Sequence, residues 1–271
     1  MKHIIFTLAI LLYGCAHIDT DAIKVCADSF NVACAGSERL IAYDKMIIDD
    51  GIIYKHVNGA KFSDLVIKMD DNFCTIEDNI VSEHAIVKAL NCDMQEFNRL
   101  LLKMSSDDPI DKSYAYFATS IEAHNRVLSR SFLYFANEYV MSHNLEMYQE
   151  AMISNHSNIV KYSELMMDQM YIVRSDMWVK YIDICDTLGT SWGQLDKTVA
   201  TRYVINMNAR MKASDTLVLQ LIEFYQELPL VYAELVDAKR TPIMWWKRNN
   251  YDHIFRLQQM ARNIRFTLGN K

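Results

Sequence analysis

Residues that end helices and form tight turns are scarce in this chain. Its 271 residues include only 7 glycines and 3 prolines, well below the usual share of about 7% and about 5%. Sandwiches, barrels and glycine-rich phosphate loops need such residues at their turns. Hydrophobic residues make up 51% of the chain, which is enough to form a core. The sequence therefore predicts an all-α protein, an irregular multi-helix bundle in which 16 methionines fill gaps between helices.

Apolar periodicity and capping residues predict where the helices of the first half lie. We expect helices over 21–35 and 37–50, ended by Gly36 and Gly51, and a helix over 75–104. Residues 52–69 leave two alternatives open, a small β-hairpin that turns at Asn58–Gly59 or more helix.

The second half contains few breaks. Residues 110–187 predict three long antiparallel helices, with turns at 142–144 and 154–158. Ser191 and Ser214 are expected to cap two further helices, the second of them kinked by Pro229. The last helix is predicted to open at Thr241–Pro242 and to end at Gly269.

The strongest break in the chain is Ser105–Pro109, so a boundary is expected there. The predicted organisation has three parts. They are a signal peptide over 1–14, an N-terminal cysteine-containing helical subdomain over 15–104, and a C-terminal helical bundle over 109–271.

The N-terminus has the three parts of an export signal. A short positive start, Met1–His3, precedes the apolar segment Ile4–Tyr13 and the small residues Gly14–Ala16. Ten apolar residues are too few to span about 30 Å of hydrocarbon as a helix. The sequence predicts export. One alternative is cleavage after Ala16, by which the exported chain would be released as a soluble protein beginning at His17. The other alternative, without export, is a buried N-terminal helix.

Leu12-Tyr13-Gly14-Cys15 resembles the lipobox of bacterial lipoprotein precursors, although Tyr13 is larger than the usual residue at its position. The resemblance implies cleavage before Cys15, attachment of lipid, including palmitate, to that cysteine, and anchorage to the cell envelope. Ala16 in place of Asp implies the outer membrane, facing the periplasm, if the host has two membranes.

Five cysteines follow Cys15, and an oxidising compartment would allow them to pair. If 21–35 is one helix, Cys26 and Cys34 lie about 12 Å apart along its axis, beyond the limit of about 7 Å between the Cα atoms of a disulfide. These two are therefore expected to pair with Cys74 and Cys92, and a bridge between them would require a break near Asn31. Because no C-x-x-C pair occurs, no metal site is predicted.

Charge is distributed unevenly along the chain. The net charge of −6 argues against a nucleic-acid binder. Residues 239–271 carry eight Lys and Arg and one acid, a net +7, which leaves −13 for the preceding 238 residues. Two alternatives follow for this basic tail. It packs on its own acidic body, which we favour, or it lies on an anionic membrane or an acidic partner.

The last helix is predicted to be amphipathic. Its expected apolar stripe contains Ile254, Leu257, Ala261, Ile264 and Leu268. The basic surface candidates are Lys247, Arg248, Arg256, Arg262 and Arg265.

Most catalytic signatures are absent, including the P-loop, dinucleotide-binding, zinc-protease and C-x-x-C motifs, so no cofactor is predicted. One motif is present, because residues 189–193 fit G-x-S-x-G with Ser191 at the centre. Asp215 or Asp237 and then His253 follow in the order that α/β-hydrolases use. The apolar spacing before Ser191 indicates a helix, whereas this motif needs a preceding strand.

Taken together, these features favour a bacterial envelope lipoprotein with a helical interaction or structural domain and no catalysis. Its expected partners are the membrane, through lipidated Cys15, and an unidentified protein. One alternative is an exported serine hydrolase that uses Ser191 and His253. Another is a mobile-element or phage lipoprotein that acts in exclusion.

Overall fold

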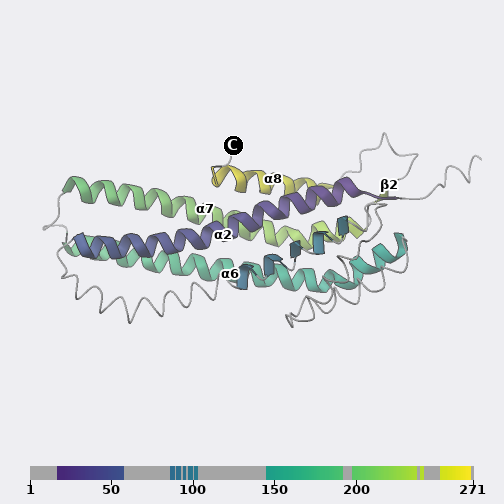
Figure 1. Cartoon of the computed structure of the whole chain (residues 1–271), viewed down its shortest axis with the longest axis horizontal. Coiled ribbons are helices and arrows are strands. Elements are labelled where there is room, and N and C mark those ends of the chain that lie inside the picture. The colour runs from purple at the N-terminus through teal and green to yellow at the C-terminus, as the bar shows by residue number, and fades with distance from the viewer. Residues whose placement is uncertain are drawn as a thin grey trace, which may run out of the picture. The chain divides into compact units, whose positions relative to one another are not determined.

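Long helices dominate the computed structural model (Figure 1). It describes residues 17–57, 145–191, 197–236, 239–240 and 251–269, and also 86–102 except 89, 93, 96 and 100. The helices are α2 (Thr20–Val57), α6 (Leu145–Ser191), α7 (Lys197–Val236) and α8 (Asp252–Thr267). Every described residue between 86 and 102 is also helical. The prediction of an all-α protein is confirmed.

The remaining regular structure is one short antiparallel pair. Strand β1 (His17–Ile18) pairs with β2 (Lys239–Arg240), with His17 opposite Arg240 and Ile18 opposite Lys239. The start of the described chain is therefore hydrogen-bonded to the segment that follows α7.

Helix α2 is one helix of 38 residues, so the prediction that Gly36 and Gly51 end separate helices was wrong. A Cβ atom built on Gly36 would lie 3.1 Å from Ile264 Cγ2 and 3.3 Å from Leu221 Cδ2. Gly36, inside α2, therefore allows the side chains of Ile264 and Leu221 to come close to the helix backbone. Residues 52–57 are helical, which corrects the hairpin alternative for this part, and 58–69 lie outside the described residues.

Helix α6 is also continuous, through the turn predicted at 154–158. Asn155 is buried on the helix, and its side-chain oxygen accepts a hydrogen bond of 3.2 Å from the amide of Asn158. The two side chains bond to each other along one side of the helix, and α6 continues through both residues. This prediction of a turn was wrong, and the one at 142–144 lies outside the described residues.

Helix α7 begins and ends elsewhere than predicted. Ser191, the expected cap, is the last residue of α6, and Ser214, the second expected cap, is buried within α7. Pro229 lies inside α7, which continues to Val236. Proline has no N–H to donate to the carbonyl one turn earlier, yet packing on both sides of it keeps the segment helical.

The end of the last helix was predicted correctly. Gly269 has a φ of 75°, and its N–H donates to the carbonyl of Phe266 over 3.0 Å. This left-handed conformation favours glycine and satisfies a carbonyl at the helix end. Helix α8 begins at Asp252, after the non-helical Tyr251, so the prediction that the last helix opens at Thr241–Pro242 was wrong.

The contacts divide the chain into two compact units, each made of three separate segments. Unit 1 contains the described residues within Met1–Asn31, Cys92–Ser163 and Gln226–Ala261, and unit 2 those within Val32–Asn91, Glu164–Tyr225 and Arg262–Lys271. The boundary predicted at 105–109 lies outside the described residues and stays a prediction.

Aromatic and aliphatic side chains form the core of unit 1. The ring of Phe30 packs against Tyr162 at 5.9 Å between centroids, and Phe97 packs against Tyr232 at 5.7 Å. Tilted pairs at this separation suit the ring quadrupoles. Other buried members of this core are Ile23, Met94, Leu101, Met152, Ile159, Leu228, Val231, Leu235, Ile254 and Leu257.

The core of unit 2 is rich in methionine, as the composition predicted. Flexible thioether side chains fill irregular gaps between helices. The buried methionines of this unit are Met166, Met170, Met177, Met207 and Met211. In the same unit Ser37 Oγ donates to the carbonyl of Cys34 over 2.9 Å and accepts from Asn91 Nδ2 over 3.1 Å, so this buried hydroxyl is satisfied.

None of the described helices has an apolar stretch long enough to span a membrane.

We expect Gly36→Val to lower the free energy of unfolding by about 1–3 kcal/mol, because the new side chain overpacks Ile264 and Leu221. Urea titration followed by circular dichroism measures the change. The matched control is Gly189→Ala, since Gly189 is an exposed helical glycine with no atom within 4 Å of an added Cβ. That control should raise the stability by up to about 1 kcal/mol. A neutral Gly36→Val would contradict the close approach.

Candidate functional site

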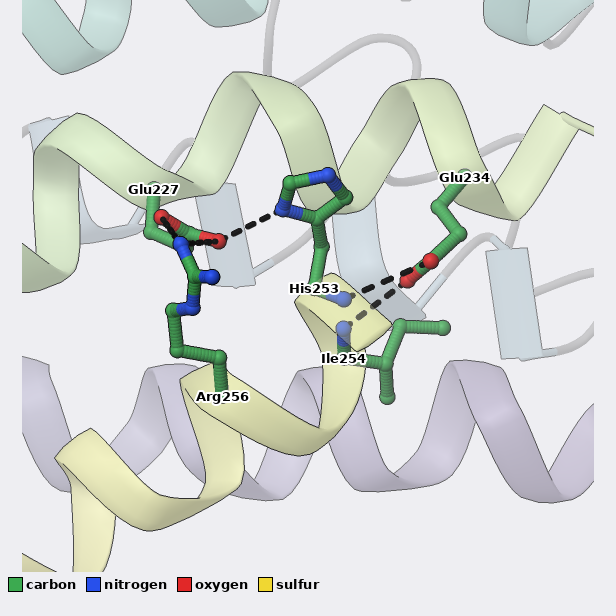
Figure 2. A network of polar contacts seen from close by, with 5 residues as sticks. All are labelled: Glu227, Glu234, His253, Ile254 and Arg256. Atoms are coloured by element: carbon green, nitrogen blue, oxygen red, sulfur yellow. Dashed lines mark hydrogen bonds and ion pairs between the residues drawn. The ribbon is translucent and has the colours of Figure 1, made fainter. Parts of the chain in front are cut away.

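The N-terminal turn of α8 is held by a carboxylate from α7 (Figure 2). Glu234 Oε1 accepts the backbone N–H of His253 over 3.3 Å, and Oε2 accepts that of Ile254 over 2.9 Å. The first N–H groups of a helix have no partner within it, and a negative charge there also complements the helix dipole. Glu234 therefore caps α8 from a neighbouring helix.

A second carboxylate of α7 binds the side chains of the same turn. Glu227 Oε1 lies 2.6 Å from His253 Nδ1, and Arg256 Nη1 lies 3.4 Å from both carboxylate oxygens. In Figure 2 the His253 ring and the Arg256 guanidinium both point toward this carboxylate. Glu227 is only 7% exposed, and a carboxylate removed from water is costly unless it is paired. We call Glu227, Glu234, His253 and Arg256 the α7–α8 clamp.

One further contact attaches α8 to the start of α2. Tyr251, the residue before α8, donates its hydroxyl to Asp19 Oδ2 over 3.1 Å. Asp19 also accepts the N–H of Ala22 at Oδ1 over 3.4 Å, so it is the N-cap of α2. The N-terminal ends of α2 and α8 are therefore joined through one aspartate.

The apolar stripe predicted for the last helix is confirmed. Its five members are all buried, and together with the clamp they show that α8 packs on its own chain. The remaining basic candidates in this helix, Arg262 and Arg265, are exposed, as is Arg256. Lys247 and Arg248 lie outside the described residues.

A buried thiol lies in the core of unit 1. Burial raises the pKa of the Cys26 thiol to about 12, although a hydrogen bond with Tyr232 acts in the opposite direction. The Tyr232 hydroxyl also donates to Asn98 Oδ1. With its pKa raised, the Cys26 thiol is protonated at neutral pH. Because the thiolate is the nucleophilic form of cysteine, Cys26 is a poor nucleophile there.

The structure describes three of the four cysteines predicted to form disulfides. Cys26 and Cys34 are buried and Cys92 is exposed, and no disulfide joins any two of these three described cysteines. Helix α2 is unbroken at Asn31, so the break that a bridge between Cys26 and Cys34 would require does not occur. Cys15 and Cys74 lie outside the described residues, and pairing through Cys74 stays a prediction.

The residues of the hydrolase alternative have other roles in the structure. Ser191 follows 46 residues of helix in α6, whereas a nucleophile elbow follows a strand. Asp215, in unit 2, accepts from Arg174 Nε over 2.7 Å and from Trp178 Nε1 over 3.0 Å. The hydrogen bond from Arg174 is the main cause that lowers the pKa of Asp215. His253 belongs to unit 1 and contacts Glu227, and Asp237 lies outside the described residues.

Glu227 and Glu234 were not among the residues predicted from the sequence. The sequence feature that could have indicated them is their spacing of seven residues, which places both on the same side of a helix. Leu228, Val231 and Leu235, all buried, lie close to them in the sequence. Two carboxylates beside a buried stripe indicate partners on another element, but the sequence does not say which element.

The described contacts of the clamp are hydrogen bonds and ion pairs within the chain. Among the described residues, no group of three or more His, Cys, Asp and Glu side chains is placed to hold a metal ion. Comparisons with protein families, curated proteins and solved structures gave no match. Function is therefore inferred from the residues of this chain alone.

We expect Glu234→Ala to destabilise the protein by about 1–2 kcal/mol, the usual cost of losing a helix cap, because two N–H groups of α8 lose their acceptor. Denaturant unfolding measures the loss. Glu223→Ala is the matched control, since Glu223 is exposed on the same helix, and it should change stability by less than about 0.5 kcal/mol. Equal losses in the two variants would argue against capping by Glu234.

Proposed function

We propose that the chain is the precursor of a bacterial envelope lipoprotein, anchored through Cys15, whose helical domain binds another protein and has no catalytic activity. The observation that carries the proposal is the position of the lipobox relative to the fold. Only Ala16 separates Cys15 from β1. Cleavage before Cys15 would remove the apolar segment and leave β1, Asp19 and α2 intact.

A short connection has a consequence for placement. Two residues of extended chain span at most about 7 Å, so a lipid on Cys15 would bring the paired strands β1 and β2 close to the bilayer surface. The folded domain would then lie against the membrane and not at the end of a long tether.

An exposed apolar face on α6 supports a protein partner. Within unit 2, Leu165, Ile172 and Val179 recur every seven residues, and Tyr171 and Trp178 lie beside them. All five are more than a third exposed. Residues seven apart lie on one side of a helix, and Asp168 and Asp176 lie between them on that side. Exposed aromatic side chains such as Tyr171 and Trp178 are enriched where protein partners bind.

The environments of the hydrolase residues support the absence of catalysis. Asp215 is bound by an arginine and an indole N–H, and the Nδ1 atom of His253 by Glu227. The clamp has an evident structural role, because it satisfies N–H groups and a buried carboxylate.

The test is metabolic labelling of the full chain with an alkyne analogue of palmitate in a bacterium that matures lipoproteins. We expect wild type to carry the label and Cys15→Ala to lose it, since no other cysteine stands directly after the cleavage site. Cys92→Ala is the control, because Cys92 is an exposed thiol, and it should keep the label.

Three outcomes would overturn the proposal. The first is a Cys15→Ala protein that still carries lipid, and the second is a wild-type protein whose unlipidated N-terminus is His17. The third is covalent labelling by a fluorophosphonate that disappears in Ser191→Ala, because it would show a catalytic serine.

A further inference from the structure

Helix α8 has a second face that the clamp and the core do not use. Phe255 is 58% exposed, and Phe266 is 85% exposed, the most exposed of the large hydrophobic side chains that the structure describes. The stripe from Ile254 to Leu268 is buried, so packing among the described residues does not account for these two rings.

These rings lie on one line with an arginine. In a helix with 3.6 residues per turn, positions 255, 262 and 266 fall on the same side, opposite the buried stripe. Arg262 therefore lies between the two phenylalanines, and Arg265 lies beside Phe266. All four side chains are exposed, and about 16 Å of helix axis separates the two rings.

The charge of this face has one sign. No Asp or Glu occurs after Asp252, so residues 253–271 contain only basic charged side chains. The rest of the chain is acidic. Exposed aromatic rings flanked by arginines are typical of helices that lie in the interface of anionic membranes, where each basic residue near the surface strengthens binding about fivefold.

The attachment of α8 places its first turn near the anchor. Tyr251 is hydrogen-bonded to Asp19, and Asp19 is four residues after Cys15, a reach of at most about 14 Å. If Cys15 is lipidated, as the proposed function holds, the start of α8 would lie close to the bilayer. Phe255 would then be one turn of helix further on.

We propose that the exposed face of α8, formed by Phe255, Arg262, Arg265 and Phe266, docks on an anionic phospholipid surface. The arginines contact lipid phosphates and the rings enter the boundary between headgroups and acyl chains. The lipid on Cys15 confines the protein to the membrane, and α8 sets which side of it faces the bilayer.

The test is co-sedimentation of residues 15–271 carrying Cys15→Ala, so that no lipid contributes, with two kinds of vesicle. One is phosphatidylcholine alone and the other contains added phosphatidylglycerol. We expect binding to the anionic vesicles only, weakened by salt. Arg262→Glu together with Arg265→Glu should weaken it by about tenfold or more.

The control has the same change in charge at exposed positions of α7, Arg202→Glu together with Lys212→Glu, and should bind nearly as wild type does. Phe266→Ser should weaken binding, whereas Ile205→Ser, which removes an exposed side chain of α7, should not. Circular dichroism should show the same helix content in all variants.

Failure of the unmodified face to bind anionic vesicles would overturn the proposal, and so would an equal loss in the α7 control. Either failure can be told apart from failure of the proposed function. The vesicle test uses residues 15–271 with Cys15→Ala, which carry no lipid, whereas the lipid label is measured on the full chain in cells.

Discussion

The capping of α8 by carboxylates from α7 is the interaction on which the described tail depends. A helix of 16 residues is only marginally stable by itself in water. Glu234 satisfies two of its first N–H groups, and Glu227 pairs with His253 and Arg256. These bonds compensate for the partial burial of Glu227, which would otherwise destabilise the fold. With its first turn fixed, the apolar stripe of α8 is directed toward the core and the opposite side toward solvent.

That arrangement underlies the proposed role of α8 at a membrane. Arg256 of α8 forms an ion pair with Glu227 of α7, and His253 contacts the same carboxylate. Helix α8 also leaves Arg262 and Arg265 exposed beside Phe266. One helix can thus both complete the fold and present a cationic surface. The proposed lipid on Cys15 would act at the same end of α2, because Asp19 bonds to the residue that precedes α8.

The spacing of apolar residues predicted correctly the features that depend on a single helix. It failed for features that depend on contacts between distant parts of the chain. The all-α class and the buried stripe of α8 follow from the rarity of glycine and the spacing of apolar residues. The end at Gly269 follows from its left-handed φ. Gly36 was misread as a helix end because its role is a close approach to Ile264, which lies more than two hundred residues away in the sequence. Ser214 was wrongly predicted to be a helix cap. Serine is typical of the residue before a helix, but here it is buried in the middle of α7. The clamp was missed for the same reason, since Glu227 and Glu234 meet their partners only in the folded chain.

Hydrogen exchange of the full chain, read peptide by peptide by mass spectrometry, tests most directly whether α8 is an integral part of the fold. If the clamp and the stripe hold it, amides in residues 252–261 should exchange as slowly as those of α7 in residues 226–236, because both segments belong to unit 1 and would open only with its packing. The backbone N–H groups of His253 and Ile254 should be protected although they begin the helix, since Glu234 binds them. Exchange of residues 252–261 at the rate of an unstructured peptide, while α7 stays protected, would contradict the role of the clamp.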